Sequence, residues 1–215
     1  MDTVIATSIE RVTSALLSVN YMYLKLACET SAIEPDHFAE EVLVPVLDTL
    51  GERWQRGDVS LAQVYMSGRM CERLLDENAA VKPKQLCDHA LAVAVLEDFH
   101  VLGKRIVCSV LHSVGYEFKD YGPISLGDLV EKVREDKIRI LLVSTLMLAS
   151  ALRVKLLKER LASLDWEVKL VVGGAPFRFD PDLWREVGAD ATSATASGVV
   201  AVLSTLISEA SHDNV

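Results

Sequence analysis

Residues 2–80 carry apolar side chains at every third or fourth position, as in VIATSIERVTSALLSV (4–19) and HFAEEVLVPVLDTLGERW (37–54). This spacing aligns them on one face of an α-helix. Breaks in the pattern fall near Asn20, Pro35 and Gly57. Asp58 or Ser60 can cap the helix after the last break, and Pro45 should bend the helix that contains it. The pattern predicts a small bundle of four antiparallel helices.

The segment ENAAVKPKQLCDHA (77–90) loses the helical period and carries Pro83 between two lysines. Proline lacks a backbone donor and interrupts helices and strands, so such a segment is typical of a linker. A chain of 215 residues is long enough for two small cores. We therefore expect a helical domain over 1–84 and a second domain over 85–215, with a hinge at Pro83.

After the linker, short β-rich apolar runs alternate with amphipathic stretches. We expect strands at 91–96, 117–121, 138–144, 167–172 and 190–194. We expect helices at 101–114, 126–135, 148–164, 181–187 and 197–210. This alternation predicts a Rossmann-like, flavodoxin-like domain with a five-stranded parallel sheet. Ligands of such domains bind beyond the carboxyl ends of the strands.

Charge and composition exclude several classes of protein. The net charge is −9 and the pI is about 5.1, with no stripe of Lys and Arg, so we expect no nucleic-acid partner. The apolar runs ALAVAVL (90–96) and IRILLVSTLMLASAL (138–152) are too short or too interrupted to cross a membrane. The first residues lack a secretory pattern, and the four cysteines form no C-x-x-C pair, which favours a reduced, cytoplasmic protein.

A histidine follows the first expected strand, in the stretch EDFHVLGK (97–104). A neutral imidazole is a good metal ligand, and the carboxylate of Asp98 could fix the tautomer of His100 and raise its basicity. Gly103, which has no Cβ, would let a backbone or a ligand approach closely. Taken alone, a histidine beside an aspartate is more often a helix cap or a surface pair.

Further polar or small residues follow two other expected strands. Ser144 and Ser150 lie in VSTLMLAS (143–150), and Gly173 and Gly174 lie in VVGGAPF (171–177). Each pair has a simple structural explanation, as helix caps or as a turn. Because the strands are parallel, however, all of these residues should meet at one edge of the sheet.

This combination resembles the cobalamin-binding domain of the methionine synthase and corrinoid methyl-carrier family, over residues 90–210. The matching residues are Asp98, His100 and Gly103, followed by Lys104, then Ser144 and Leu146, then Gly173 and Gly174, with GAD at 188–190 also in agreement. The chain departs from the family at Glu97, where a glycine usually precedes the motif aspartate, while Thr145 fills the variable place of S-x-L. The departures concern the detail of the loop rather than the imidazole.

The resemblance implies that cobalamin binds with its own dimethylbenzimidazole off the cobalt and with His100 as the lower axial ligand. It implies a cofactor-binding set of Asp98, His100, Val101, Leu102, Gly103, Ser144, Leu146, Ser150, Gly173 and Gly174. Within this set, Ser150 would contact the Asp98 carboxylate and complete a relay of histidine, aspartate and serine. The glycines would leave room for the nucleotide tail of the cofactor, and Ser144 would hydrogen-bond near it.

The stretch LGERWQRGDVSLAQVYMSGRM (50–70) resembles the helical cap that precedes this domain in the same family. The residues expected to shield the upper face of the corrin are Trp54, Val64, Tyr65 and Met66. The alternative interpretation is that these four side chains are ordinary core of the bundle.

The function implied by the resemblance is that of a corrinoid methyl carrier, the corrinoid subunit of a methyltransferase system rather than a stand-alone enzyme. It would hold methylcobalamin in the loaded state and move a methyl group from a small methylated donor to a folate or thiol. The implied partners are donor-side and acceptor-side methyltransferases and a reductive activation protein; the sequence leaves the oligomeric state open. The alternatives are a cobalamin-dependent sensor, the small subunit of an adenosylcobalamin mutase, and a flavin-binding or cofactor-free module.

Overall fold

The computed structural model describes residues 2–78 and 90–212, which divide into two compact units, Met1–Val81 and Lys82–Val215. Each unit buries its own set of apolar side chains. The expected domain boundary at 84/85 and the expected hinge at Pro83 lie outside the described residues. Within the described ranges, no helix combines the length and the apolar character needed to cross a membrane.

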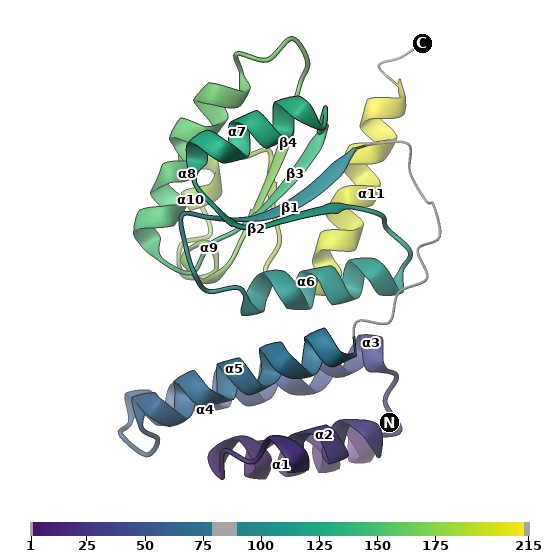
Figure 1. Ribbon diagram of the computed structural model, residues 1–215, viewed down its shortest axis with the longest axis vertical. Coiled ribbons are helices and arrows are strands. Elements are labelled where there is room, and N and C mark those ends of the chain that lie inside the picture. Colours follow the sequence, from purple (N-terminus) through teal and green to yellow (C-terminus); the bar gives the residue numbers. More distant parts are fainter. Residues whose placement is uncertain (1, 79–89, 213–215) are drawn as a thin grey trace. The chain divides into compact units, whose positions relative to one another are not determined.

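The first unit is entirely helical (Figure 1). Its elements are α1 (Asp2–Leu17), α2 (Tyr21–Glu29), α3 (Pro35–Phe38), η1 (Ala39–Leu43), α4 (Val44–Gln55) and α5 (Leu61–Glu77). Helix α1 contacts α2, η1, α4 and α5, and it buries Val12, Ala15 and Leu16 completely. The chain breaks where the sequence predicts, and the Oδ1 atom of Asn20 accepts a hydrogen bond of 3.0 Å from the first turn of α2.

The third helical segment runs without interruption from α3 through η1 to α4, and η1 is a π-helical turn just before Pro45. In this turn the N–H of Val44 donates to the carbonyl of Ala39, five residues earlier. A proline ring inside a regular α-helix clashes with the carbonyl four residues before it. A wider turn moves the preceding carbonyls apart, so the helix passes Pro45 with a π-helical turn where the sequence predicted a bend.

Ser60 caps α5 through a complete capping box. The backbone N–H of Gln63 donates to the Ser60 hydroxyl at 3.2 Å, and the Gln63 side chain accepts from the backbone N–H of Ser60 at 3.0 Å. Two backbone donors of the first turn thereby obtain partners. Ser60, and not Asp58, is therefore the cap of this helix.

We expect Ser60→Ala to lower the free energy of unfolding of the helical unit by about 1 kcal/mol, because the N–H of Gln63 loses its acceptor. The measurement is urea unfolding followed by far-ultraviolet circular dichroism. Thr49→Ala is the matched control, since the exposed Thr49 hydroxyl only donates back to Pro45 in its own helix. An equal effect of both substitutions would contradict a capping role.

The second unit is a parallel sheet with the strand order β2-β1-β3-β4-β5 (Figure 1). The strands are β1 (Leu91–Leu96), β2 (Lys119–Ile124), β3 (Ile140–Ser144), β4 (Lys169–Gly173) and β5 (Ala191–Thr192). The helices are α6 (Leu102–Ser113), α7 (Leu126–Glu135), α8 (Leu148–Leu161), α9 (Ala175–Phe179), α10 (Leu183–Glu186) and α11 (Ala196–His212). This order is that of the flavodoxin-like doubly wound fold, as the sequence predicts.

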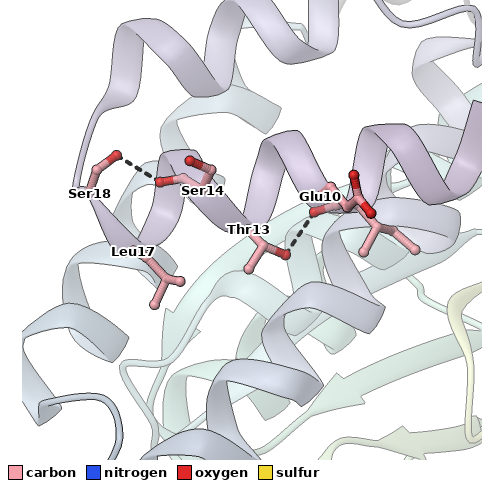
Figure 2. A pocket seen from close by; sticks show the side chains of 6 residues that line it. Glu10, Thr13, Ser14, Leu17 and Ser18 are labelled. Atoms are coloured by element: carbon pink, nitrogen blue, oxygen red, sulfur yellow. Dashed lines mark hydrogen bonds between the residues drawn. The ribbon is translucent and has the colours of Figure 1, made fainter.

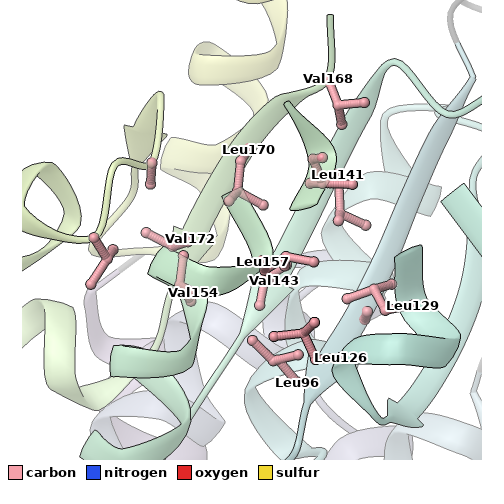
Figure 3. Packing of buried hydrophobic residues seen from close by; sticks show 14 of the residues in the cluster. Leu96, Leu126, Leu129, Leu141, Val143, Val154, Leu157, Val168, Leu170 and Val172 are labelled. Carbon is pink, nitrogen blue, oxygen red and sulfur yellow. The ribbon is translucent and has the colours of Figure 1, made fainter. Parts of the chain in front are cut away.

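The two faces of the sheet bury alternate residues of each strand. On one face, Ala94, Val143 and Val172 pack against helices α7 to α10, and Figure 3 shows this cluster with Val154 and Leu157 of α8. On the other face, alternate residues of β1, β3 and β4 pack against α6 and α11. Successive side chains of a strand point to opposite faces of the sheet. The continuous apolar run of β1 therefore indicates a strand that is covered on both faces.

Most expected strands and helices of the second unit differ from the structure by one to three residues at one end or both. The strand expected at 117–121 lies at Lys119–Ile124, the strand expected at 190–194 is only Ala191–Thr192, and the helix expected at 181–187 is preceded by the unpredicted α9. Strand β2 is an edge strand, with a bulge where it pairs with Val93 and Ala94 of β1. An edge strand tolerates the Gly122 and Pro123 that look like a turn in the sequence.

Candidate functional site

The loop between β1 and α6 holds His100 against a buried carboxylate. The Oδ1 atom of Asp98 lies 2.6 Å from Nδ1 of His100 and accepts backbone N–H groups of Phe99 at 2.7 Å and His100 at 3.1 Å. The Asp98 side chain is 1% exposed, whereas that of His100 is 56% exposed. A hydrogen bond at Nδ1 leaves Nε2 as the nitrogen that can bind a metal.

The second oxygen of Asp98 ties this loop to the end of β3. Its Oδ2 atom accepts the backbone N–H groups of Leu146 at 2.8 Å and Met147 at 2.9 Å. Burial by itself raises the pKa of the Asp98 carboxyl, but the bonds from Met147, His100 and Leu146 outweigh it and lower the pKa to about 2. The carboxylate is therefore ionised at neutral pH.

The expected contact between the Ser150 hydroxyl and the Asp98 carboxylate is wrong. The Ser150 hydroxyl donates instead to the backbone carbonyl of Glu97 at 2.9 Å. Both oxygens of Asp98 are already occupied by the bonds just described, most of them from backbone N–H groups. Ser150 thus holds the loop one residue before the aspartate, and the relay is limited to Asp98 and His100.

Gly103, Ser144 and Gly174 lie close together at the carboxyl edge of the sheet. A methyl group at Gly103 would lie 3.6 Å from the Ser144 hydroxyl, and one at Gly174 would lie 1.8 Å from the backbone oxygen of Thr145. Gly174 also has a φ of +118°, which only glycine adopts readily. Gly173 has ordinary space, since the nearest atom to a methyl group there is 3.7 Å away.

The motif lysine and the GAD sequence have structural roles. Lys104 is buried, and its ammonium pairs with Asp120 of β2, which fixes the first turns of α6 to the edge of the sheet. Asp190 accepts bonds of 2.6 Å from the Lys158 ammonium and from the backbone N–H of Leu170, near the start of β4. Asp190 therefore lies at the amino edge of the sheet, away from His100.

Sequence reasoning named Val101, Leu102 and Leu146 near His100 but missed Phe99 and Met147. Phe99 is 90% exposed and Met147 is 53% exposed, beside Leu146 at 44%, while Val101 and Leu102 are half-buried. Exposed apolar side chains gathered in this way are typical of a binding surface. The signal was present in the sequence, because Phe99 and Met147 are apolar residues in loops at strand ends.

The four expected shield residues belong to α4 and α5 of the helical unit. Trp54 is 46% exposed, Tyr65 65% and Met66 41%, and Val64 is half-buried. The alternative that these side chains form the bundle core therefore fails for Trp54, Tyr65 and Met66. Their role as a shield for the corrin stays a prediction.

A hollow on the surface of the helical unit carries no site. It is lined by Ile9, Glu10, Thr13, Ser14 and Leu17 of α1 and by Ser18 just after this helix (Figure 2). The hydroxyls of Thr13 and Ser18 donate at 2.7 Å to carbonyls of α1. A single helix face with internally bonded hydroxyls offers no converging groups to a ligand.

The residues around His100 suit a metal that is already held by a macrocycle. In residues 2–78 and 90–212, no three or more His, Cys, Asp or Glu side chains come together to hold a bare metal ion. The half-exposed imidazole of His100 could nevertheless supply a protein donor to a metal whose other ligands come from a corrin. The residues at this edge therefore fit cobalamin.

Comparison with known families agrees with this geometry. A family model described as a B12 binding domain matches residues 89–203, and a second model with the same description matches residues 8–77. The first match contains the loop of Asp98 and His100, and the second covers most of the helical unit. Both units of the chain thus match cobalamin-binding families.

Several relatives of this chain are methylamine corrinoid proteins of Methanosarcina species. Monomethylamine corrinoid protein 1 of Methanosarcina mazei is 30% identical over 179 residues, covering 78% of this chain and 81% of that protein. Trimethylamine corrinoid protein of Methanosarcina barkeri is 28% identical over 180 residues, covering 80% and 82%.

Two solved structures share the fold. The monomethylamine corrinoid protein of Methanosarcina barkeri superposes with a TM-score of 0.77 at 24% identity, covering 92% of this chain and 97% of that one. A methanol:cobalamin methyltransferase complex from the same organism gives a TM-score of 0.51 at 18% identity, covering 94% and 80%. The chain belongs to the B12 binding domain family, and its cofactor is cobalamin.

Proposed function

We propose that this protein is a corrinoid methyl carrier that binds cobalamin through His100 and passes a methyl group between partner methyltransferases. The observation that carries the proposal is the half-exposed imidazole of His100, with Nδ1 bonded to buried Asp98 and Nε2 free. When bound, cobalamin supplies a cobalt atom that can accept a methyl group and give it up again. The relatives named as methylamine corrinoid proteins support the same assignment.

In this proposal Nε2 of His100 would hold the cobalt of bound cobalamin. The Asp98 carboxylate, which is bonded to Nδ1 and to four backbone N–H groups, would fix the tautomer and the orientation of the ring. Because these bonds lower the pKa of Asp98 to about 2, the carboxylate would keep its negative charge beside the imidazole at neutral pH.

The other residues at the sheet edge would receive the cofactor with its benzimidazole displaced. Gly103 lies beside the Ser144 hydroxyl, so the nucleotide tail can approach the backbone while Ser144 offers a hydrogen bond. Gly173 and Gly174 would leave room for the same tail. Val101, Leu102 and Leu146 would pack against the corrin, and Ser150 would support the loop from behind.

We assign the partners by the chemistry of the reaction. A donor-side methyltransferase would load the cobalt from a small methylated compound, and an acceptor-side enzyme would deliver the methyl group to a folate or thiol. A reductive activation protein would restore the cofactor after accidental oxidation. Trp54, Val64, Tyr65 and Met66 would exclude water from the reactive face, and the protein would act in the cytoplasm.

Replacing His100 tests the ligand. We expect wild-type protein reconstituted with hydroxocobalamin or methylcobalamin to give a histidine-ligated, benzimidazole-free spectrum, which His100→Ala abolishes because no imidazole then reaches the cobalt. His112→Ala is the matched control, since His112 also lies near the start of this unit but stacks on Phe118. After chemical reduction of the bound hydroxocobalamin by one electron to Co(II), for example with dithionite, the nitrogen splitting in the electron paramagnetic resonance spectrum should change on 15N-histidine labelling in wild type and in His112→Ala.

The methyl-transfer step requires its own assay. The loaded protein should transfer its methyl group to a methyltransferase encoded near its gene, and His100→Ala should reduce this transfer. Retention of the benzimidazole on cobalt, or a spectrum unchanged by His100→Ala, would contradict the ligand assignment. A change of oligomeric state on illumination, without methyl transfer, would point to a sensor instead.

A further inference from the structure

Glu97 has a backbone conformation that charged residues rarely adopt. Its φ is +45°, and it directly follows β1 and precedes the aspartate that holds His100. A residue with a Cβ in the left-handed region is strained unless its surroundings hold it there. Strain at this point implies that neighbouring groups fix the position of the loop.

Four contacts join Glu97 to other elements of the sheet domain. Its backbone N–H donates to the Ile124 carbonyl at the end of β2, at 2.9 Å, and its carbonyl accepts the Ser150 hydroxyl of α8, at 2.9 Å. Its carboxylate accepts the backbone N–H of Leu126 at 3.2 Å and the Nε of Arg153 at 2.9 Å. One residue thus connects the strand end to β2, α7 and α8.

We propose that Glu97, clamped by Arg153 of α8, is a positioning residue that sets the reach of His100 towards the cobalt. This proposal rests on the proposed function, because it takes His100 as the ligand. Glu97 does not touch the metal or the imidazole; it acts through the backbone of Asp98 and Phe99, the two residues that separate it from His100. Loss of the clamp should let the loop move and lower the share of cobalt that carries the imidazole.

A purely stabilising ion pair would behave differently. Removing it would lower the melting temperature without changing the loop or the spectrum at temperatures well below unfolding. The pair between Arg134 and Glu131 on α7 provides the comparison, because both carboxylate oxygens of Glu131 lie 3.0 Å from the same guanidinium nitrogen on an exposed helix face. Glu97→Gln and Glu131→Gln therefore remove the same charge from similar pairs.

The first experiment measures amide hydrogen exchange in the full-length protein without cofactor. The N–H groups of Phe99 and His100 are protected by their bonds to Asp98. In Glu97→Gln we expect these two amides to exchange about fivefold faster, which corresponds to the loss of one partly exposed charged hydrogen bond. In Glu131→Gln we expect their exchange rates to stay unchanged. Arg153→Met should produce the same change and provides a second variant if Glu97→Gln folds poorly.

The second experiment measures the share of histidine-ligated spectrum after loading with hydroxocobalamin. We expect Glu97→Gln and Arg153→Met to lower the ratio of ligated to unligated cofactor about fivefold, with the double variant no worse than either single variant. Unchanged amide exchange and an unchanged ratio in both variants would overturn the proposal. If His100→Ala itself leaves the spectrum unchanged, the proposed function fails, while the exchange result still decides whether Glu97 holds the loop.

Discussion

Gly174→Ala is expected to abolish stable folding of the cobalamin-binding unit, with a loss of more than about 4 kcal/mol in its free energy of unfolding. The added methyl group would lie 1.8 Å from the backbone oxygen and 2.9 Å from the carbonyl carbon of Thr145. These are backbone atoms of the β3–α8 loop, so they cannot rotate away as a side chain can. The φ of +118° and ψ of −179° add strain, because this region is almost exclusive to glycine.

Gly173→Ala provides the matched control for this prediction. Its methyl group would meet the backbone oxygen of Ser193 at 3.7 Å, an ordinary contact, so we expect a change of less than about 1 kcal/mol. Urea unfolding followed by circular dichroism measures both variants. Equal midpoints for Gly174→Ala and wild type would show that the loop of Thr145 can move aside, contrary to the packing described above.

The second large effect is expected from Asp98→Asn, at about 3 kcal/mol in the free energy of unfolding. Both oxygens of the carboxylate accept at least two N–H groups, so the amide nitrogen of asparagine would face donors in either orientation. The same substitution should lower the share of histidine-ligated cobalamin, since His100 loses the partner of Nδ1. Asp182→Asn is the control, because Asp182 is 77% exposed and pairs only with Arg185.

The pH dependence of stability follows from the same carboxylate. The pKa of Asp98 is about 2 in the folded protein and about 3.9 in an unfolded chain. The folded state is therefore favoured by about 2 kcal/mol above pH ~4, and this contribution is lost as the pH falls from ~4 to ~2. Asp98→Asn should flatten the loss of stability in that window, and a loss as steep as that of wild type would contradict the prediction.

Much of the fold could be predicted because its core follows simple periods. The buried run of β1 and the amphipathic α7 lie exactly where their patterns place them, at Leu91–Leu96 and Leu126–Glu135. In β1 all six residues are buried, and in α7 four buried apolar residues recur at helical spacing. Both patterns are plain in the sequence. The parallel sheet with helices between its strands followed from the alternation of strand and helix patterns.

The elements that escaped prediction are those fixed by tertiary contacts. Helix α9 is only five residues long, so no period could reveal it. It follows Gly174, and Pro176 lies in its first turn, where a missing N–H does no harm. At the site, the carboxylate of Asp98 and its histidine were predicted, but the destination of the Ser150 hydroxyl was not. A serine at that spacing reaches either a side chain or a carbonyl, and only the packed loop decides between them.

The π-helical turn before Pro45 has a consequence for engineering of the helical unit. One additional residue in a turn rotates everything after it by about 100° relative to a regular helix. After this turn Val46 and Leu50 are buried in the core, whereas Trp54 is 46% exposed. Deleting one residue from Ala39–Leu43 to make a regular helix would therefore rotate the second half of the helix away from its present orientation, even if Pro45 were replaced at the same time.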